Sequence, residues 1–123
     1  MMAERQIDPR LKKIIADGDT KTLVSYAMEL GERVAGGDLG RTQIRNIYGM
    51  VKAFESKRTR DYDQLILMLP KLRYAAARER RLRPLVEALS DAILLIGEDE
   101  ERFQRFANFF EAVVAYHYAA SQD

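Results

Sequence analysis

Apolar residues recur every three or four positions along most of this chain, which is the spacing of one buried face of an α-helix. No segment alternates polar and apolar residues over the length of a strand, and glycines and prolines interrupt the helical pattern at intervals. The pattern predicts an all-α fold, a compact bundle of about five to six helices. At 123 residues the chain is most simply one helical-bundle domain that covers residues 1–123.

Capping residues predict where the first helices begin and end. Asp8 followed by Pro9 is typical of a helix start, and Asp19 predicts the start of the next helix. A glycine-containing loop, GGDLGR at residues 36–41, should end the second helix. We therefore expect the third helix to begin at Thr42.

Prolines and glycine divide the second half of the chain. Pro70 interrupts a helical segment from about Asp61 to Arg81, and its ring removes one hydrogen bond and clashes with the preceding turn, so we expect a kink or restart there. Pro84 should start the next helix and Gly97 should end it. The acidic run 98–101 then matches the positive end of the last helix dipole.

The apolar stripes predict which side chains form the core. In the second helix we expect Val24 and Met28 to widen the buried stripe. In the last helix His117 is in phase with the core aromatics, which predicts a packed histidine. Phe109 and Tyr116 remain on a second side, where they could contact a partner subunit.

Basic residues are concentrated in the middle of the chain. Between Arg41 and Arg83 there are twelve Lys and Arg residues against four Asp and Glu residues, a net charge of +8. The remaining eighty residues hold eight positive against fifteen negative charges, a net −7, so the formal total of +1 conceals a strong asymmetry. This distribution is expected if one surface meets a polyanion.

The spacing of these cations favours contact with a nucleic-acid backbone. A separation of seven places two residues on one helical face, about 10 Å apart along the axis. Three pairs have it: Arg45 and Lys52, Lys71 and Arg78, and Arg73 and Arg80. Tyr74 and Tyr48 could supply rings for stacking. The alternative is a solvated face with ion pairs inside each helix, which the scarcity of acidic partners disfavours.

Catalytic and metal-binding chemistry has little support in the residues. The chain has no cysteine and one histidine, and consecutive acidic residues point to different sides of a helix, so we expect no catalytic residue, no metal site and no cofactor. Phosphate-cradling glycine loops are also absent from the sequence. The charged start MMAERQIDPR lacks the apolar stretch of a signal peptide, and the longest aliphatic run is too short to span a membrane, so we expect a cytoplasmic protein.

Two blocks of sequence carry a family resemblance. TQIRNIYGMVKAF at 42–54 and LPKLRYAAAR at 69–78 resemble, in order and spacing, two signature blocks of the small subunit of the type III-A CRISPR effector, the Csm complex. The similarity extends from about residue 40 to the aromatic last helix.

The resemblance implies an all-helical subunit present in several copies, stacked beside the backbone subunits that hold the CRISPR RNA. Such subunits line the channel for guide and target RNA, and cleavage belongs to other subunits. The resemblance and the charge together predict the RNA-binding residues. From the two blocks these are Arg45, Lys52, Lys71, Tyr74 and Arg78, and from charge alone Arg41, Arg73, Arg80 and Arg81.

We therefore expect a non-catalytic RNA-binding structural subunit that contacts phosphates and leaves sequence specificity to base pairing. Its partners would be CRISPR RNA, target RNA, the backbone and large subunits, and sister copies of itself, with no membrane. Two alternatives remain open. TQIRNIY could be the recognition helix of a helix-turn-helix DNA-binding regulator, or the chain could be a helical adaptor that binds only proteins.

Overall fold

The structure is a computed structural model that describes residues 6–122. In this range the chain forms seven α-helices and one 3-10 turn, with no strand, so the predicted all-α fold is confirmed. The elements are α1 (Pro9–Ile15), α2 (Thr20–Arg33), α3 (Asp38–Glu55), α4 (Tyr62–Ile66), α5 (Met68–Arg78), the 3-10 turn η1 (Arg80–Leu82), α6 (Arg83–Ile96) and α7 (Glu100–Ala120). Because α4 and α5 are two parts of one interrupted segment, the predicted number of helices also agrees.

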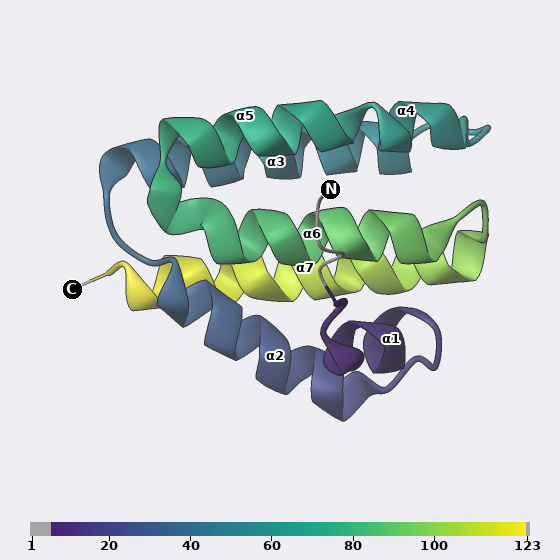
Figure 1. Ribbon diagram of the computed structural model, residues 1–123, viewed down its shortest axis with the longest axis horizontal. Coiled ribbons are helices and arrows are strands. Elements are labelled where there is room, and N and C mark those ends of the chain that lie inside the picture. Colours follow the sequence, from purple (N-terminus) through teal and green to yellow (C-terminus); the bar gives the residue numbers. More distant parts are fainter. Residues whose placement is uncertain (1–5, 123) are drawn as a thin grey trace.

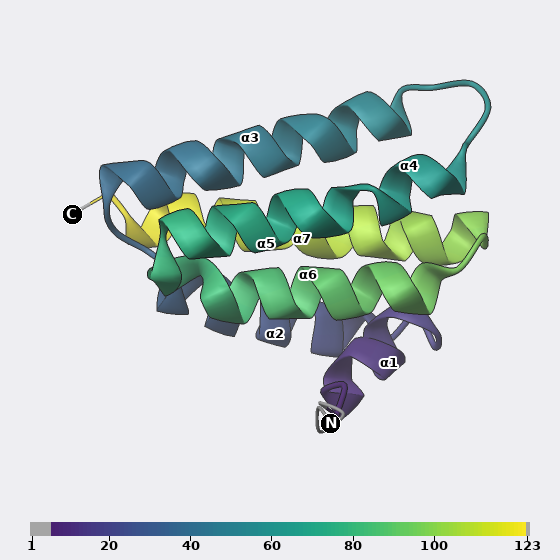
Figure 2. The ribbon, with the colours of Figure 1, turned by 45° about the horizontal axis from the view of Figure 1, so that its top comes forward.

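The bundle is organised around α7. This helix packs against α1, α2, α3 and α6, while α5 packs against α6 (Figure 1). In Figure 2, α3, α5 and α6 follow one another from top to bottom, with α7 and α2 behind them and α1 below α6. The four phenylalanine side chains of α7 are fully buried in the resulting core: Phe103, Phe106, Phe109 and Phe110.

The capping residues begin the helices as the sequence predicts. The Asp8 carboxylate accepts a hydrogen bond from Arg10 N at 2.9 Å, and that of Asp19 accepts one from Thr22 N at 3.1 Å. These bonds satisfy amide groups that have no partner inside the helix. Gly97 follows α6 with φ of 58°, so the predicted glycine stop is confirmed.

Arginines cap two helix C-termini from the side of α7. Arg102 Nη1 donates to the carbonyl of Leu95 at 2.8 Å, near the end of α6. Arg105 Nη1 donates to the carbonyls of Ile15 and Ala16 at 3.2 and 3.1 Å, at the end of α1. These cations therefore stabilise the negative ends of two helix dipoles.

The start of α3 differs from the prediction. The helix begins at Asp38, four residues before Thr42. Gly37, with φ of 80°, turns the chain at the N-cap, so no longer loop is needed. Asp38 in the first turn also matches the helix dipole.

The segment around Pro70 breaks as expected, but its end was predicted wrongly. The chain restarts between Ile66 and Met68, which makes Pro70 the third residue of α5, a position whose amide has no helical acceptor. The helix then ends at Arg78 instead of Arg81, because Glu79 is extended with φ of −138°.

Three core assignments were wrong. Val24 and Met28 are 43% and 41% exposed, because α2 turns a different side toward the core, that of Tyr26, Ala27, Leu30 and Gly31. Phe109 is fully buried and its ring lies 5.6 Å from that of Tyr26, since the central helix α7 is covered on more than one side. Phe109 is therefore unavailable to a partner subunit.

Candidate nucleic-acid interface

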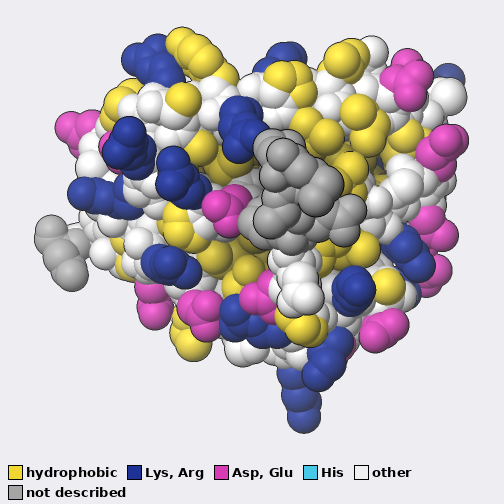
Figure 3. Space-filling view, viewed as in Figure 1, with side chains coloured by type: hydrophobic (Ala, Val, Ile, Leu, Met, Phe, Trp, Pro, Cys, Tyr) yellow, Lys and Arg dark blue, Asp and Glu magenta, His cyan; other side chains and the backbone are white. Residues whose placement is uncertain are grey.

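Basic side chains gather at one end of the molecule. Figure 3 shows Lys and Arg over the C-terminal part of α5 and the beginning of α6. All nine residues predicted to contact RNA are exposed. They come from α3, α5 and η1, and the structure distributes them over several places instead of one face.

Arg45 and Lys52 lie on the outer side of α3. The stripe of Ile44, Ile47 and Val51 faces the core and leaves these two cations in solvent, so their predicted separation from the core is confirmed. Lys52 Nζ lies 3.0 Å from Glu55 Oε1, and this hydrogen bond raises the pKa of Lys52. Because both groups are solvent-accessible, the ion pair contributes little to stability and can be replaced by a phosphate.

The two predicted stacking rings have different environments. The Tyr48 side chain is half-buried and its ring packs edge-on against that of Phe110, with centroids 5.8 Å apart. Tyr74 is 61% exposed, and its hydroxyl accepts a hydrogen bond from Arg78 Nη1 at 3.2 Å. Tyr74 is therefore the ring that is accessible to a base.

Lys71 lies on the flank of α5 that faces α3. Together with Lys57 it lines a groove of about 170 Å³ between these helices, with Met50, Phe54 and Met68 among the other lining side chains. Arg45 and Lys52 are not among the residues that line this groove, since they are offset around the α3 axis from Met50.

Arg73 and Arg80 lie on the other flank of α5. They do not share a helical face as the seven-residue spacing predicted, because α5 ends at Arg78 and Arg80 belongs to η1. They nevertheless line one groove of about 500 Å³ between α5 and α6, together with Arg83. Sequence reasoning missed Arg83 because it compared positions within single helices. The run of four arginines from 78 to 83 was the available signal.

Arg41 and Arg81 belong to the end of the bundle where α2 meets α3. The Arg81 guanidinium lies over the turn at Gly36 and Gly37, within 3 Å of the position that a Cβ on Gly36 would take. Arg41 is near enough to His117 to lower its pKa further, although burial is the larger cause.

Arg60 belongs to the basic segment but has a structural position. Its Nη1 donates to the carbonyls of Phe54, Glu55 and Lys57 at 3.2, 2.6 and 2.8 Å, at the end of α3. Its Nη2 lies 2.9 Å from Glu100 Oε1 on α7. These contacts occupy the guanidinium, so Arg60 does not count among the cations that are available to a ligand.

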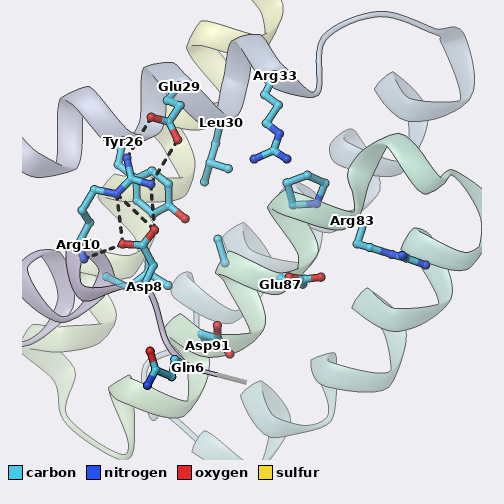
Figure 4. A pocket seen from close by; sticks show the side chains of 13 residues that line it. Gln6, Asp8, Arg10, Tyr26, Glu29, Leu30, Arg33, Arg83, Glu87 and Asp91 are labelled. Carbon is cyan, nitrogen blue, oxygen red and sulfur yellow. Dashed lines mark hydrogen bonds and ion pairs between the residues drawn. The ribbon is translucent and has the colours of Figure 1, made fainter. Parts of the chain in front are cut away.

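Another hollow, between α1, α2 and α6, is lined by charges of both signs. Its volume is about 330 Å³, and Figure 4 shows Arg10 between the carboxylates of Asp8 and Glu29. Arg10 lies 2.8 Å from Asp8 and 3.0 Å from Glu29, and its hydrogen bond lowers the pKa of Asp8. The guanidinium also stacks 3.9 Å from the Tyr26 ring centroid. Four acidic residues and three arginines line this hollow, and one of the arginines, Arg83, also lines the α5–α6 groove. The hollow therefore lacks the net positive charge of that groove.

The described residues contain no group of three or more His, Cys, Asp and Glu side chains that could hold a metal ion. His117 is packed as predicted, with 3% of its surface exposed. Over residues 6–122, no helix has the length and hydropathy needed to cross a bilayer.

The family comparison is specific. Among curated proteins and among solved structures, no match to this chain was found. The family model described as Csm2 Type III-A matches residues 17–123, which include α2 to α7 and all nine predicted contact residues. The match begins earlier than the expected residue 40. The chain therefore belongs to the Csm2 Type III-A family, the small subunit of the type III-A CRISPR effector complex.

Proposed function

We propose that this subunit, acting as one helical domain, binds RNA in the type III-A complex without catalysing a reaction. It lines the channel for CRISPR RNA and target RNA and contacts the backbone subunits, the large subunit and sister copies of itself in the cytoplasm. The observation that carries the proposal is the exposure of all nine predicted contact residues in a member of an effector-complex family.

Phosphate contact suits the available chemistry. Arginine and lysine side chains bind phosphate oxygens through charge-assisted hydrogen bonds, and their attraction does not depend on base sequence. Tyr74 adds a ring on which any base can stack. Sequence specificity is then left to pairing between guide and target.

A non-catalytic role agrees with the position of the single histidine. His117 is buried among the side chains of the bundle, where it cannot reach a scissile phosphate. The exposed acidic residues near the start of α7 include Glu100, whose carboxylate binds Arg60 and Tyr62. A helix-turn-helix regulator would instead bind one duplex sequence tightly. Thr42 to Tyr48 forms the interior of α3, not the start of a helix.

The test compares two sets of charge-neutral variants. The first changes Arg45, Lys52, Lys71 and Arg78 to Gln, and the control changes the exposed Lys12, Lys13 and Lys21 to Gln. Affinity for labelled single-stranded RNA is measured as a function of salt. We expect each lost phosphate contact to lower the salt slope by roughly 0.7, with similar losses for different sequences and an unchanged helical spectrum.

Two results would contradict the proposal. Equal losses from both sets would show only attraction to a charged molecule. Full binding by the first set, with helicity retained, would place the nucleic-acid surface elsewhere.

A further inference from the structure

Three arginines from three elements converge on the groove between α5 and α6. Arg73 comes from α5, Arg80 from η1 and Arg83 from the first turn of α6. They converge because Glu79 is extended and the 3-10 turn reverses the chain between two helices that pack side by side. The groove is thus produced by the helix break.

The groove carries a net positive charge, because three arginines and one acidic residue line it. The acidic residue is Glu87. Guanidinium groups held around one hollow repel one another, and an anion between them would remove this cost.

The shape of the groove suits a phosphate group. Its volume is about 500 Å³, and the remaining lining residues are the small apolar side chains Ala76, Ala77 and Val86. An apolar wall lowers the local dielectric and strengthens the attraction between guanidinium and phosphate. Arginine forks also match phosphate oxygens in geometry, which lysine ammonium groups do not.

We propose that the α5–α6 groove is a second phosphate-binding site, which holds the backbone of single-stranded RNA. It lies on the flank of α5 opposite Lys71, because Lys71 lines the groove with α3 and Arg73 lines the groove with α6. The inference rests on the proposed function, since it assumes the same ligand. Its consequence is that one subunit contacts two stretches of backbone, on either side of α5.

The experiment uses the full chain and labelled oligouridylates of two lengths, 8 and 24 nucleotides. The groove variant carries Arg73→Gln, Arg80→Gln and Arg83→Gln, and a matched variant carries Arg45→Gln, Lys52→Gln and Lys71→Gln. Each removes three charges.

We expect the groove variant to bind the longer RNA at least tenfold more weakly, with a salt slope lower by roughly 2, at about 0.7 for each lost contact. The short RNA should lose less than about threefold, because it can still occupy the remaining site. If the triple variant loses its helical spectrum, Arg80→Gln in the exposed turn should show the same trend with a slope change of roughly 0.7.

Each other outcome overturns the inference. Unchanged RNA binding by the groove variant, with loss in the matched variant, removes the second site and leaves the proposed function intact. No loss in either variant contradicts both. A groove variant that keeps RNA affinity but fails to assemble with the other subunits would assign the groove to an acidic protein surface. Binding of inorganic phosphate without any change in the RNA salt slope would show a site for free anions only.

Discussion

At the scale of single residues, Gly31 determines how closely α2 approaches α7. A Cβ at this position would lie 2.8 Å from the backbone nitrogen of His117 and the backbone oxygen of Val113. Since backbone atoms cannot move aside cheaply, Gly31→Ala should lower the free energy of unfolding by about 1–3 kcal/mol.

Gly49, on the exposed side of α3, provides the control, because a Cβ added there would have no atom within 4 Å. Gly49→Ala should therefore raise the free energy of unfolding by about 0.5–1 kcal/mol, as measured by urea titration. Similar effects from both changes would contradict the close approach at Gly31.

His117 makes the stability of the bundle depend on pH. Its Nε2 atom is buried without a hydrogen-bond partner, and burial, followed by the charge of Arg41, lowers its pKa. The unfolded chain therefore binds a proton more readily than the folded chain. The free energy of unfolding should keep its full value above about pH 6.5, the pKa of histidine in the unfolded chain. Below that pH it should decline, by at most about 1.4 kcal/mol per pH unit.

The chain has one histidine, so this decline can be assigned to a single side chain. Urea unfolding at pH 7.5 and pH 5.5 should show a loss that His117→Gln abolishes. Equal pH dependence in the variant would show that the decline comes from other groups.

At the scale of elements, Arg60 joins the end of α3 to the start of α7. Its guanidinium donates hydrogen bonds to carbonyls at the end of α3 and forms an ion pair with the Glu100 carboxylate. The same carboxylate accepts a hydrogen bond from the Tyr62 hydroxyl at 2.8 Å. Burial and this hydrogen bond raise the pKa of Tyr62 to about 12. Arg60→Ala should cost about 1–3 kcal/mol in urea titrations, because it leaves carbonyls and a carboxylate without their partner.

The same variant separates structural from ligand-binding cations. Because its guanidinium is occupied, Arg60→Ala should leave the salt slope of RNA binding unchanged at temperatures where the protein remains folded. Arg58, exposed in the same connection, provides the control, and Arg58→Ala should not affect stability. A change of slope with Arg60→Ala alone would show that this residue contacts RNA.

The elements also show what could be predicted from the sequence. Helix limits that depend on local chemistry were predicted correctly, such as the caps at Asp8 and Asp19 and the break before Pro70. The early start of α3 was not predicted, because it depends on the backbone angle of Gly37. Burial of Phe109 depends on which helix lies at the centre, and this is a tertiary property. For the same reason, counting along the chain identified exposed cations but could not show that Arg83 joins Arg73 in one groove.

At the scale of the whole molecule, charge is separated along the longest axis. Lys and Arg predominate at the end where α5 meets α6, while Asp and Glu predominate at the opposite end, around the connection from α6 to α7 (Figure 3). The exposed acidic end includes Glu98 and Glu101. Opposite charges at the two ends favour contact between the acidic end of one copy and the basic end of the next, and such a contact should weaken with salt.

This polarity predicts self-association that is weak alone, stronger on RNA and reduced by salt. Sedimentation velocity with a fixed length of RNA should detect it at 50 mM salt and show less of it at 300 mM. The double variant Glu98→Gln, Glu101→Gln should reduce the association between copies. Because it removes negative charge, it should not weaken RNA binding. A loss of assembly in this variant therefore cannot be attributed to a loss of RNA. The control makes the same charge change away from that end, with Glu32→Gln and Glu111→Gln. Association that is insensitive to salt, or equally reduced by both variants, would show that contact between copies does not depend on the charged ends.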